Sequence, residues 1–125
     1  MIVSPIPNWT ASKWKGWIIS LLRKGTIRYP PRNECLRNAF VDRRVNPNTG
    51  RMAKHYRCAS CLEVFPLKQV CVDHIESVIP TTGFTTWDDY IQRMFCSVEG
   101  LQILCVECHA MKSSEENRQR KSNGK

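Results

Sequence analysis

The sequence contains no long apolar run. Its most apolar stretch, residues 17–22, is interrupted by Ser20 and flanked by basic residues. A membrane-spanning helix needs about 20 apolar residues, so we exclude an integral membrane protein and expect no membrane partner. Residues 1–8 include Pro5 and Pro7 but no basic residue and no small-residue cleavage site, which is unlike a signal peptide. We therefore expect a cytoplasmic protein.

Acidic residues are scarce in the first half of the chain. Residues 1–57 hold 12 Lys and Arg but only two acids, a net charge of +10, whereas residues 58–125 carry −2. Such a basic segment is expected to bind a polyanion, with nucleic acid as the first candidate. Contacts from Arg and Lys to phosphates give affinity but little sequence information. The basic residues are Lys13, Lys15, Arg23, Lys24, Arg28, Arg32, Arg37, Arg43, Arg44, Arg51, Lys54 and Arg57.

Internal repeats and low-complexity segments are also absent, and 125 residues fit one domain with an N-terminal arm. We divide the chain into a basic, mostly helical region at 1–55, a region with the chemically active residues at 56–120, and a flexible basic tail at 121–125. The first region is the expected DNA-binding part.

The first region is predicted to contain two helices after an extended arm at residues 1–8. Thr10 or Ser12 caps the first helix, which ends near Lys24, and Pro31 begins the second, which ends near Arg44. A turn follows at 46–50. The expected buried positions are Trp14, Trp17, Ile18, Leu21 and Leu22 in the first helix, and Cys35, Leu36, Ala39 and Phe40 in the second.

The second region is predicted to mix short strands and helices. A hairpin over 56–66 presents two thiols, and an apolar strand at 69–72 ends at Asp73 and His74. After a loop at 80–86, helical spacing covers 87–95, a strand covers 101–104, and a terminal helix runs over 110–120. We expect the chain to fray from Arg118 onward.

Seven cysteines cannot form a closed set of disulfides, and four of them form two CxxC pairs. Two residues between thiolates allow both sulfurs to face one ion, so Cys58, Cys61, Cys105 and Cys108 predict a structural zinc site. The alternatives are two unrelated reduced pairs or a redox pair. The spacer of 43 residues exceeds the roughly 15–20 of a compact zinc finger, which suggests a functional insertion. The other three, Cys35, Cys71 and Cys96, are expected to be small buried hydrophobes.

Two of the three histidines stand where they could act on a phosphate. His74 follows Asp73 at a strand end, and His109 lies beside the last cysteine pair. Adjacent strand residues face opposite sides, so one can face a metal while the other faces a substrate. A helix N-terminus attracts phosphate, and a neutral histidine can take a proton from water. The alternatives are an ordinary turn and a surface histidine.

Taken in order, these residues resemble the HNH nucleases, in particular the zinc-framed members carried by phages and mobile elements. The resemblance covers about residues 56–117 and depends on the order and spacing of the matching residues. They are Tyr56, Cys58, Cys61, Val72, Asp73, His74, Ile75, Trp87, Phe95, Leu101, Gln102, Leu104, Cys105, Cys108, His109 and Lys112.

The resemblance implies an α+β protein with a small ββα-metal core, the HNH or His-Me finger fold, framed by the four-cysteine zinc site. His74 would be the general base that activates water, and Asp73 and His109 would hold a catalytic divalent ion. Mg²⁺ or Mn²⁺ suits two protein ligands completed by water. The implied activity is hydrolysis of DNA phosphodiester bonds, leaving a 5′ phosphate and a 3′ hydroxyl. Lys112 is expected to lie near a phosphate, with a solvated helix lysine as the alternative.

The sequence departs from the family pattern at two positions. Gly100 stands where members usually have an Asn that braces the loop of the general base. We expect either another brace, with Glu99 and Gln102 as candidates by position, or weakened activity. Ser113 stands where some members have a further metal-binding His.

Three functions remain open at this point. The first is a metal-dependent HNH endonuclease, phage- or mobile-element-encoded, that acts on double-stranded DNA in the bacterial host cell. It would be a monomer or homodimer, with a phage packaging protein as a further partner, and its role could be homing, packaging or host DNA attack. The second is a zinc-ribbon nucleic-acid-binding module with weakened or no catalysis, which Gly100 favours. The third is a thiol redox protein, which leaves Asp73, His74 and His109 unexplained.

Overall fold

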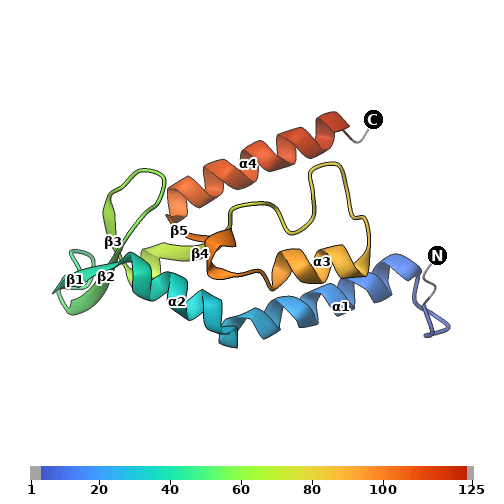
Figure 1. Cartoon of the computed structure of the whole chain (residues 1–125), viewed down its shortest axis with the longest axis horizontal. Coiled ribbons are helices and arrows are strands. Elements are labelled where there is room, and N and C mark those ends of the chain that lie inside the picture. Colours follow the sequence, from blue (N-terminus) through green and yellow to red (C-terminus); the bar gives the residue numbers. More distant parts are fainter. Residues whose placement is uncertain (1–3, 124–125) are drawn as a thin grey trace.

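A computed structural model describes residues 4–123 of the chain, and it has mixed α and β structure (Figure 1). The elements are α1 (Ala11–Gly25), η1 (Thr26–Arg28), α2 (Pro30–Ala39), β1 (Phe40–Val45), β2 (Met52–Arg57), β3 (Val64–Pro66), η2 (Leu67–Gln69), β4 (Val70–His74), α3 (Trp87–Met94), η3 (Val98–Gly100), β5 (Leu101–Cys105) and α4 (Val106–Asn123). None of the described helices is long and apolar enough to cross a membrane.

Helix α1 begins and ends where the sequence predicts. Thr10 caps it by accepting a hydrogen bond from the Lys13 backbone N–H at 3.1 Å. The predicted burial is only partly correct, because no residue of α1 is buried and the side chains of Trp17 and Leu21 are exposed. α1 runs along one side of the molecule beside α3 (Figure 1). Because α3 is much shorter than α1, it covers only part of the apolar side of α1.

The segment before α1 is turned instead of extended. The Trp9 N–H donates to the Ile6 carbonyl at 3.1 Å, and Trp9 then packs edge-on against Trp17 with ring centroids 6.4 Å apart. Residues 1–3 of the predicted arm lie outside the described residues.

The second predicted helix is too long by about five residues. α2 ends at Ala39, and residues 40–45 form strand β1 instead of continuing to Arg44. β1 pairs antiparallel with β2, and the predicted turn at 46–50 joins them, with Gly50 at φ 73°. Pairing with β2, a partner more distant in sequence, overrides the helical pattern, and it leaves Phe40 exposed although burial was predicted.

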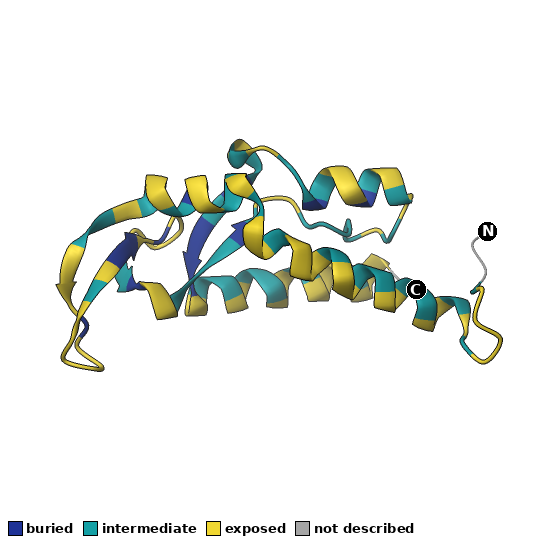
Figure 2. Ribbon diagram, turned by 90° about the horizontal axis from the view of Figure 1, so that it is seen from below, coloured by how far each residue is buried: buried dark blue, intermediate teal, exposed yellow. Residues whose placement is uncertain are grey.

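The strands form two small sheets, one at the end of the molecule opposite α1 and α3 and one between the helices (Figure 1). One has the antiparallel order β1-β2-β3, and the other pairs β4 with β5 antiparallel, with Asp73 opposite Gln102. Between them α2 packs through Cys35 against Tyr56 of β2 and Ile103 of β5, and all three side chains are buried. Figure 2 shows these buried residues concentrated on the strands, while the helices are mostly half-buried or exposed. The predicted burial of Cys35 is confirmed, whereas Cys71 and Cys96 are half-buried.

Helix α4 is longer than predicted at both ends. It begins at Val106, so that His109 lies within its first turn, and it continues to Asn123. Residues 118–123 are thus helical, and the expected fraying from Arg118 stays a prediction. Ion pairs from Lys112 to Glu116 at 2.8 Å and from Arg118 to Glu115 at 2.6 Å span successive turns and favour helix there. Residues 124–125 of the predicted tail lie outside the described residues.

Candidate functional site

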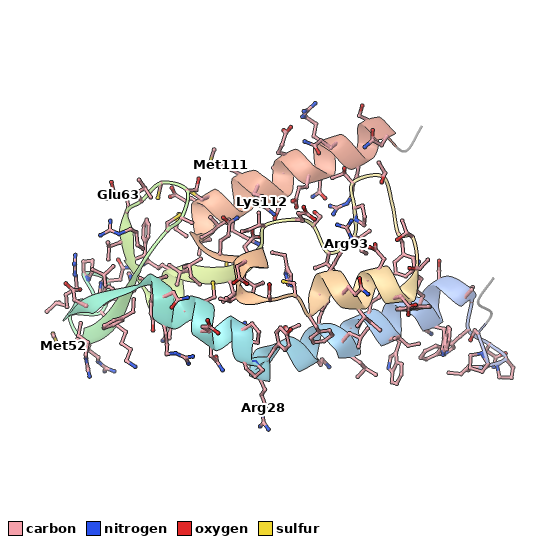
Figure 3. All side chains as sticks on the ribbon, in the orientation of Figure 1. Arg28, Met52, Glu63, Arg93, Met111 and Lys112 are labelled. Carbon is pink, nitrogen blue, oxygen red and sulfur yellow. The ribbon has the colours of Figure 1, made fainter. Side chains whose placement is uncertain are left out.

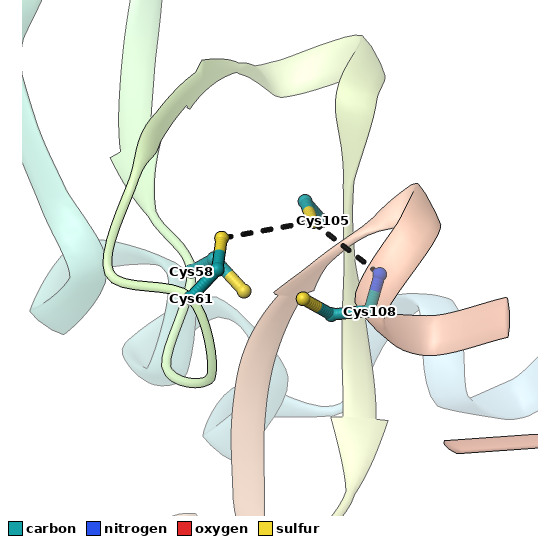
Figure 4. Close-up of side chains that lie close together, drawn as sticks. All are labelled: Cys58, Cys61, Cys105 and Cys108. Atoms are coloured by element: carbon teal, nitrogen blue, oxygen red, sulfur yellow. Dashed lines mark hydrogen bonds between the residues drawn. The ribbon is translucent and has the colours of Figure 1, made fainter. Parts of the chain in front are cut away.

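The four predicted cysteines meet in one cluster between the two sheets (Figure 4). Cys58 and Cys61 lie in the turn between β2 and β3, Cys105 ends β5, and Cys108 lies in the first turn of α4. Their sulfur atoms all lie within 4.8 Å of one another, and the Sγ atoms of Cys61 and Cys105 are 4.0 Å apart. Tetrahedral zinc with Zn–S bonds of about 2.3 Å needs sulfurs about 3.8 Å apart. The cluster could therefore hold a metal ion such as zinc.

The surroundings of the cluster favour a thiolate at Cys58 but not at Cys108. Backbone N–H groups of Ser60 and Cys108 donate to the sulfurs of Cys58 and Cys105, both at 3.4 Å. Burial raises the pKa of Cys58, but backbone donors from Cys105, Cys61 and Ser60 outweigh it and lower the pKa to about 6. The neighbouring Cys105 and burial raise the pKa of Cys108 to about 12. Four thiolates so close together need a cation to neutralise them.

A second group of predicted residues meets on the other side of β5, where β4 lies beside α4. Asp73 is buried at 8% exposure, and its Oδ1 lies 3.7 Å from Nε2 of His109. An ion with bonds of about 2.1 Å can contact two atoms up to about 4.2 Å apart. The carboxylate and imidazole pair therefore fits one divalent ion. Within residues 4–123, only the cysteine cluster brings three or more such ligands together, so water would have to complete this second set.

Asp73, His74 and His109 all line one groove, which has a volume of about 450 Å³. The Nε2 atom of His74 lies 2.8 Å from the backbone carbonyl oxygen of Met94. A carbonyl can only accept, so Nε2 carries a proton and a neutral His74 has its lone pair on Nδ1. Asp73, His74 and His109, which the sequence singled out, thus lie together.

Two further side chains, those of Gln102 and Lys112, contact the carboxylate of Asp73. Gln102 donates to Asp73 Oδ2 at 2.9 Å, and Lys112 Nζ lies 3.3 Å from the same oxygen. Lys112, on α4 (Figure 3), also donates to the His74 carbonyl at 2.9 Å and to Glu116 at 2.8 Å. Burial lowers the pKa of Lys112, but Glu116 and Asp73 raise it overall. The predicted contact of Lys112 with phosphate stays a prediction.

Glu116 is a groove residue that the sequence reasoning missed. It lies one helical turn after Lys112, and its spacing of four residues from that lysine was the available signal. Burial raises its pKa, but hydrogen bonds from Lys112 and Ser77, together with the positive charges of Lys112 and Arg120, outweigh this and leave the pKa lowered.

Two arginines, also missed, fasten the loop that follows His74. Arg93 on α3 donates to the Ser77 carbonyl at 3.2 Å and to Asp89 at 3.0 Å. Arg120 on α4 donates to the Ser77 hydroxyl at 3.2 Å and to the Ile79 carbonyl at 3.0 Å. Figure 3 shows Arg93 between α3 and this loop. The loop is therefore held from both helices.

Gly100, the departure from the family pattern, has its own place in this arrangement. Its carbonyl accepts from the Ile75 N–H at 2.9 Å, so it supports the backbone just after His74. A Cβ on Gly100 would lie 2.8 Å from the sulfur of Cys96. Of the two suggested braces, Gln102 contacts Asp73 instead of the loop, and the ring of His74 is braced by the Met94 carbonyl.

Five of the twelve basic residues expected to contact nucleic acid lie on the β1–β2 hairpin, although Arg43 and Arg44 were predicted to lie in a helix. All five side chains are exposed. Arg44 pairs with Asp42 at 2.7 Å, and Arg57 donates to the Leu62 carbonyl at 2.7 Å. The residues are Arg43, Arg44, Arg51, Lys54 and Arg57.

The fold and these groups define a small α+β protein with a four-cysteine cluster that could hold a metal ion. No protein-family model, curated protein or solved structure matches the chain.

Proposed function

We propose that the chain is a metal-dependent endonuclease of the HNH type that hydrolyses phosphodiester bonds of double-stranded DNA. In this proposal β4, β5 and α4 form the ββα-metal core, and the cysteine cluster holds structural zinc. The observation that carries the proposal is the meeting of Asp73, His74 and His109 in one groove, with the proton of His74 Nε2 committed to a backbone carbonyl.

His74 is the proposed general base. With Nε2 donating to Met94, the free lone pair on Nδ1 can accept a proton from a water molecule. The water oxygen forms a bond to phosphorus as the bond from phosphorus to the 3′ oxygen breaks, and the leaving 3′ oxygen takes a proton from a solvent water molecule. The products are a 5′ phosphate and a 3′ hydroxyl, as in the HNH family.

Asp73 and His109 are the proposed holders of Mg²⁺ or Mn²⁺. When bound, such an ion would stabilise the negative charge that develops on the phosphate and the leaving oxygen. Gln102 donates to Oδ2 of Asp73, while Oδ1 lies 3.7 Å from His109 Nε2 and 3.5 Å from the ammonium of Lys112. The role of these residues is thus to preorganise the ligand atoms.

The second candidate is a zinc-ribbon module that binds nucleic acid without cutting it. A specific observation favours it: the ammonium of Lys112 lies 3.3 Å from Asp73, so a cation of the protein already neutralises the carboxylate. A catalytic ion would have to displace that ammonium.

Incubating the protein with supercoiled plasmid and Mg²⁺ or Mn²⁺ separates the two candidates. We expect nicked or linear DNA with the wild type, none with Asp73→Ala or His74→Ala, and unchanged DNA binding by His74→Ala. A wild type that binds the plasmid but cuts it with neither ion would favour the binding module. Cleavage by His74→Ala at the wild-type rate would remove His74 from its proposed role.

A further inference from the structure

The β1–β2 hairpin has one face that nothing in the described chain covers. In its antiparallel register Arg43 lies opposite Lys54, and Val45 lies opposite Met52. Directly opposed residues project on the same side, so these four form one continuous surface, which we call the free face. Figure 1 shows the hairpin extending from the end of α2, away from α1.

The rest of the hairpin is already used in packing. Nearer the body of the molecule, Tyr56 follows the free face and is buried against Cys35 and Ile103. On the opposite face, His55 is 3% exposed and lies across from the buried Pro66 of β3. The free face is therefore the part of the hairpin that does not pack against the rest of the described chain.

The charges on the free face are not balanced within the protein. Arg43 and Lys54 are both exposed, and neither side chain has a salt bridge or hydrogen bond within residues 4–123. Like charges directly opposite each other destabilise a strand pair. On the other side of the same strand, Arg44 is neutralised by Asp42 at 2.7 Å. An external anion would therefore find two unpaired cations on the free face, whereas Arg44 is already paired.

The outer end of the free face is apolar. The side chains of Val45 and Met52 are 53% and 56% exposed although they form a cross-strand pair. Figure 3 shows Met52 at the outer end of the hairpin. A partner that neutralises Arg43 and Lys54 would therefore also contact the apolar side chains of Val45 and Met52 at the outer end of the hairpin.

We propose that the free face docks in the major groove of duplex DNA. Arg43 and Lys54 contact backbone phosphates there, while Val45 and Met52 approach the base edges. The inference rests on the proposed function for its partner, and it adds the element, the face and the groove.

The dimensions and chemistry of the major groove fit this face. The groove is about 12 Å wide and admits a two-stranded β-ribbon. The groove has phosphates along both rims, which can contact Arg43 and Lys54. It has thymine methyl groups on its floor, which can contact Val45 and Met52 at the outer end of the hairpin. The minor groove, about 6 Å wide, lacks those methyl groups.

Salt dependence of DNA binding tests the basic half of the free face. The His74→Ala protein, which keeps the probe intact, is titrated with a duplex oligonucleotide over a range of salt concentrations. We expect Arg43→Ala/Lys54→Ala to weaken binding of all duplex sequences alike and to reduce the slope of log K against log salt by about 1.8, or 0.9 per lost phosphate contact. The charge-matched control Arg118→Ala/Lys121→Ala, at the far end of α4, should keep the wild-type slope.

The apolar half and the groove need separate probes. Val45→Ser/Met52→Ser should weaken binding with an unchanged salt slope, because it removes no charge. A duplex with glucosylated 5-hydroxymethylcytosine, whose sugar fills the major groove, should bind more weakly than the unmodified duplex. Equal binding of the two duplexes would overturn the major-groove assignment.

The remaining outcomes distinguish the inference from the proposed function. If the wild-type chain binds duplex DNA but the Arg43→Ala/Lys54→Ala protein binds with the same affinity and slope as its control, only the hairpin inference fails. If the wild type binds no duplex, or binds single-stranded RNA in preference, both fail.

Discussion

Replacing Gly100 by Asn, the residue usual at this position in HNH nucleases, should destabilise the protein instead of improving it. A Cβ on Gly100 would lie 2.8 Å from Sγ and 3.3 Å from Cβ of Cys96, whereas ordinary contacts are 3.4–4 Å. Cys96 cannot easily retreat, because its carbonyl accepts a hydrogen bond from the Tyr29 hydroxyl at 2.9 Å. Either the thiol rotates or η3 shifts by about 0.6 Å.

The size of the effect follows from the crowding. Overpacking of this kind costs about 1–3 kcal/mol, and partial rotation of the Cys96 thiol places our expectation at about 1–2 kcal/mol. An unfolding entropy of about 2.1 cal/mol/K per residue then converts this cost to a fall in Tm of about 4–8 °C for a chain of this length. Gly100→Ala, which adds the Cβ alone, should account for most of it.

A double-mutant cycle measures the clash directly. Thermal unfolding followed by circular dichroism is compared for wild type, Gly100→Asn, Cys96→Ala and the double variant. The cost of Gly100→Asn should shrink by at least about 1 kcal/mol in the Cys96→Ala background, because the sulfur is gone. Plasmid cleavage by the double variant should not exceed that of Cys96→Ala, since the Met94 carbonyl already holds the His74 ring. An equal cost in both backgrounds, or a gain in activity with Asn, would refute this account of Gly100.

Three other changes have expected outcomes. Leu62 has φ 67°, so Leu62→Gly should raise stability by about 1 kcal/mol, measured by Tm, while Leu62→Ala should not. Removing metal from the cysteine cluster with a competing chelator, or changing Cys61→Ser, should lower Tm and reduce the measured zinc content below one ion per chain; an unchanged Tm after complete removal would contradict a structural role. Arg93→Ala should slow plasmid cleavage but leave duplex affinity unchanged, because it frees the Ser77 carbonyl without removing a groove ligand; wild-type cleavage would show that Arg120 alone holds the loop.

The parts of the protein that the sequence predicts well are those specified by neighbouring residues. Thr10 marks the start of α1, and the two CxxC pairs identify their ligands because the spacing itself creates the geometry. The predicted place of Asp73 and His74 at the end of an apolar strand is confirmed by β4, while their role stays a prediction. In each case the residues that form the sequence pattern are the same residues that form the helix cap, the cysteine cluster or the strand end.

The parts that the sequence did not predict depend on partners distant in the chain or on the backbone. Residues 40–45 form a strand through main-chain pairing with β2, the next strand of the same hairpin. The brace on His74 is a main-chain carbonyl, that of Met94, and a carbonyl has no sequence signature. Arg93 and Arg120 contact the loop across 16 and 41 positions, and neither distance corresponds to a helical or strand period.

The position of the cysteine cluster also explains the long spacer between its two halves. β4, α3 and β5 all lie between Cys61 and Cys105, so a bound ion would close a loop that contains Asp73 and His74. Closing a long loop lowers the entropy of the unfolded chain, which matters for a protein with few fully buried side chains. The same ion would join β2, which carries Lys54 of the free face, to α4, which carries His109. If the proposals hold, the cluster sets the orientation of the DNA-binding hairpin relative to the groove, and loss of metal should uncouple binding from cleavage before it abolishes binding.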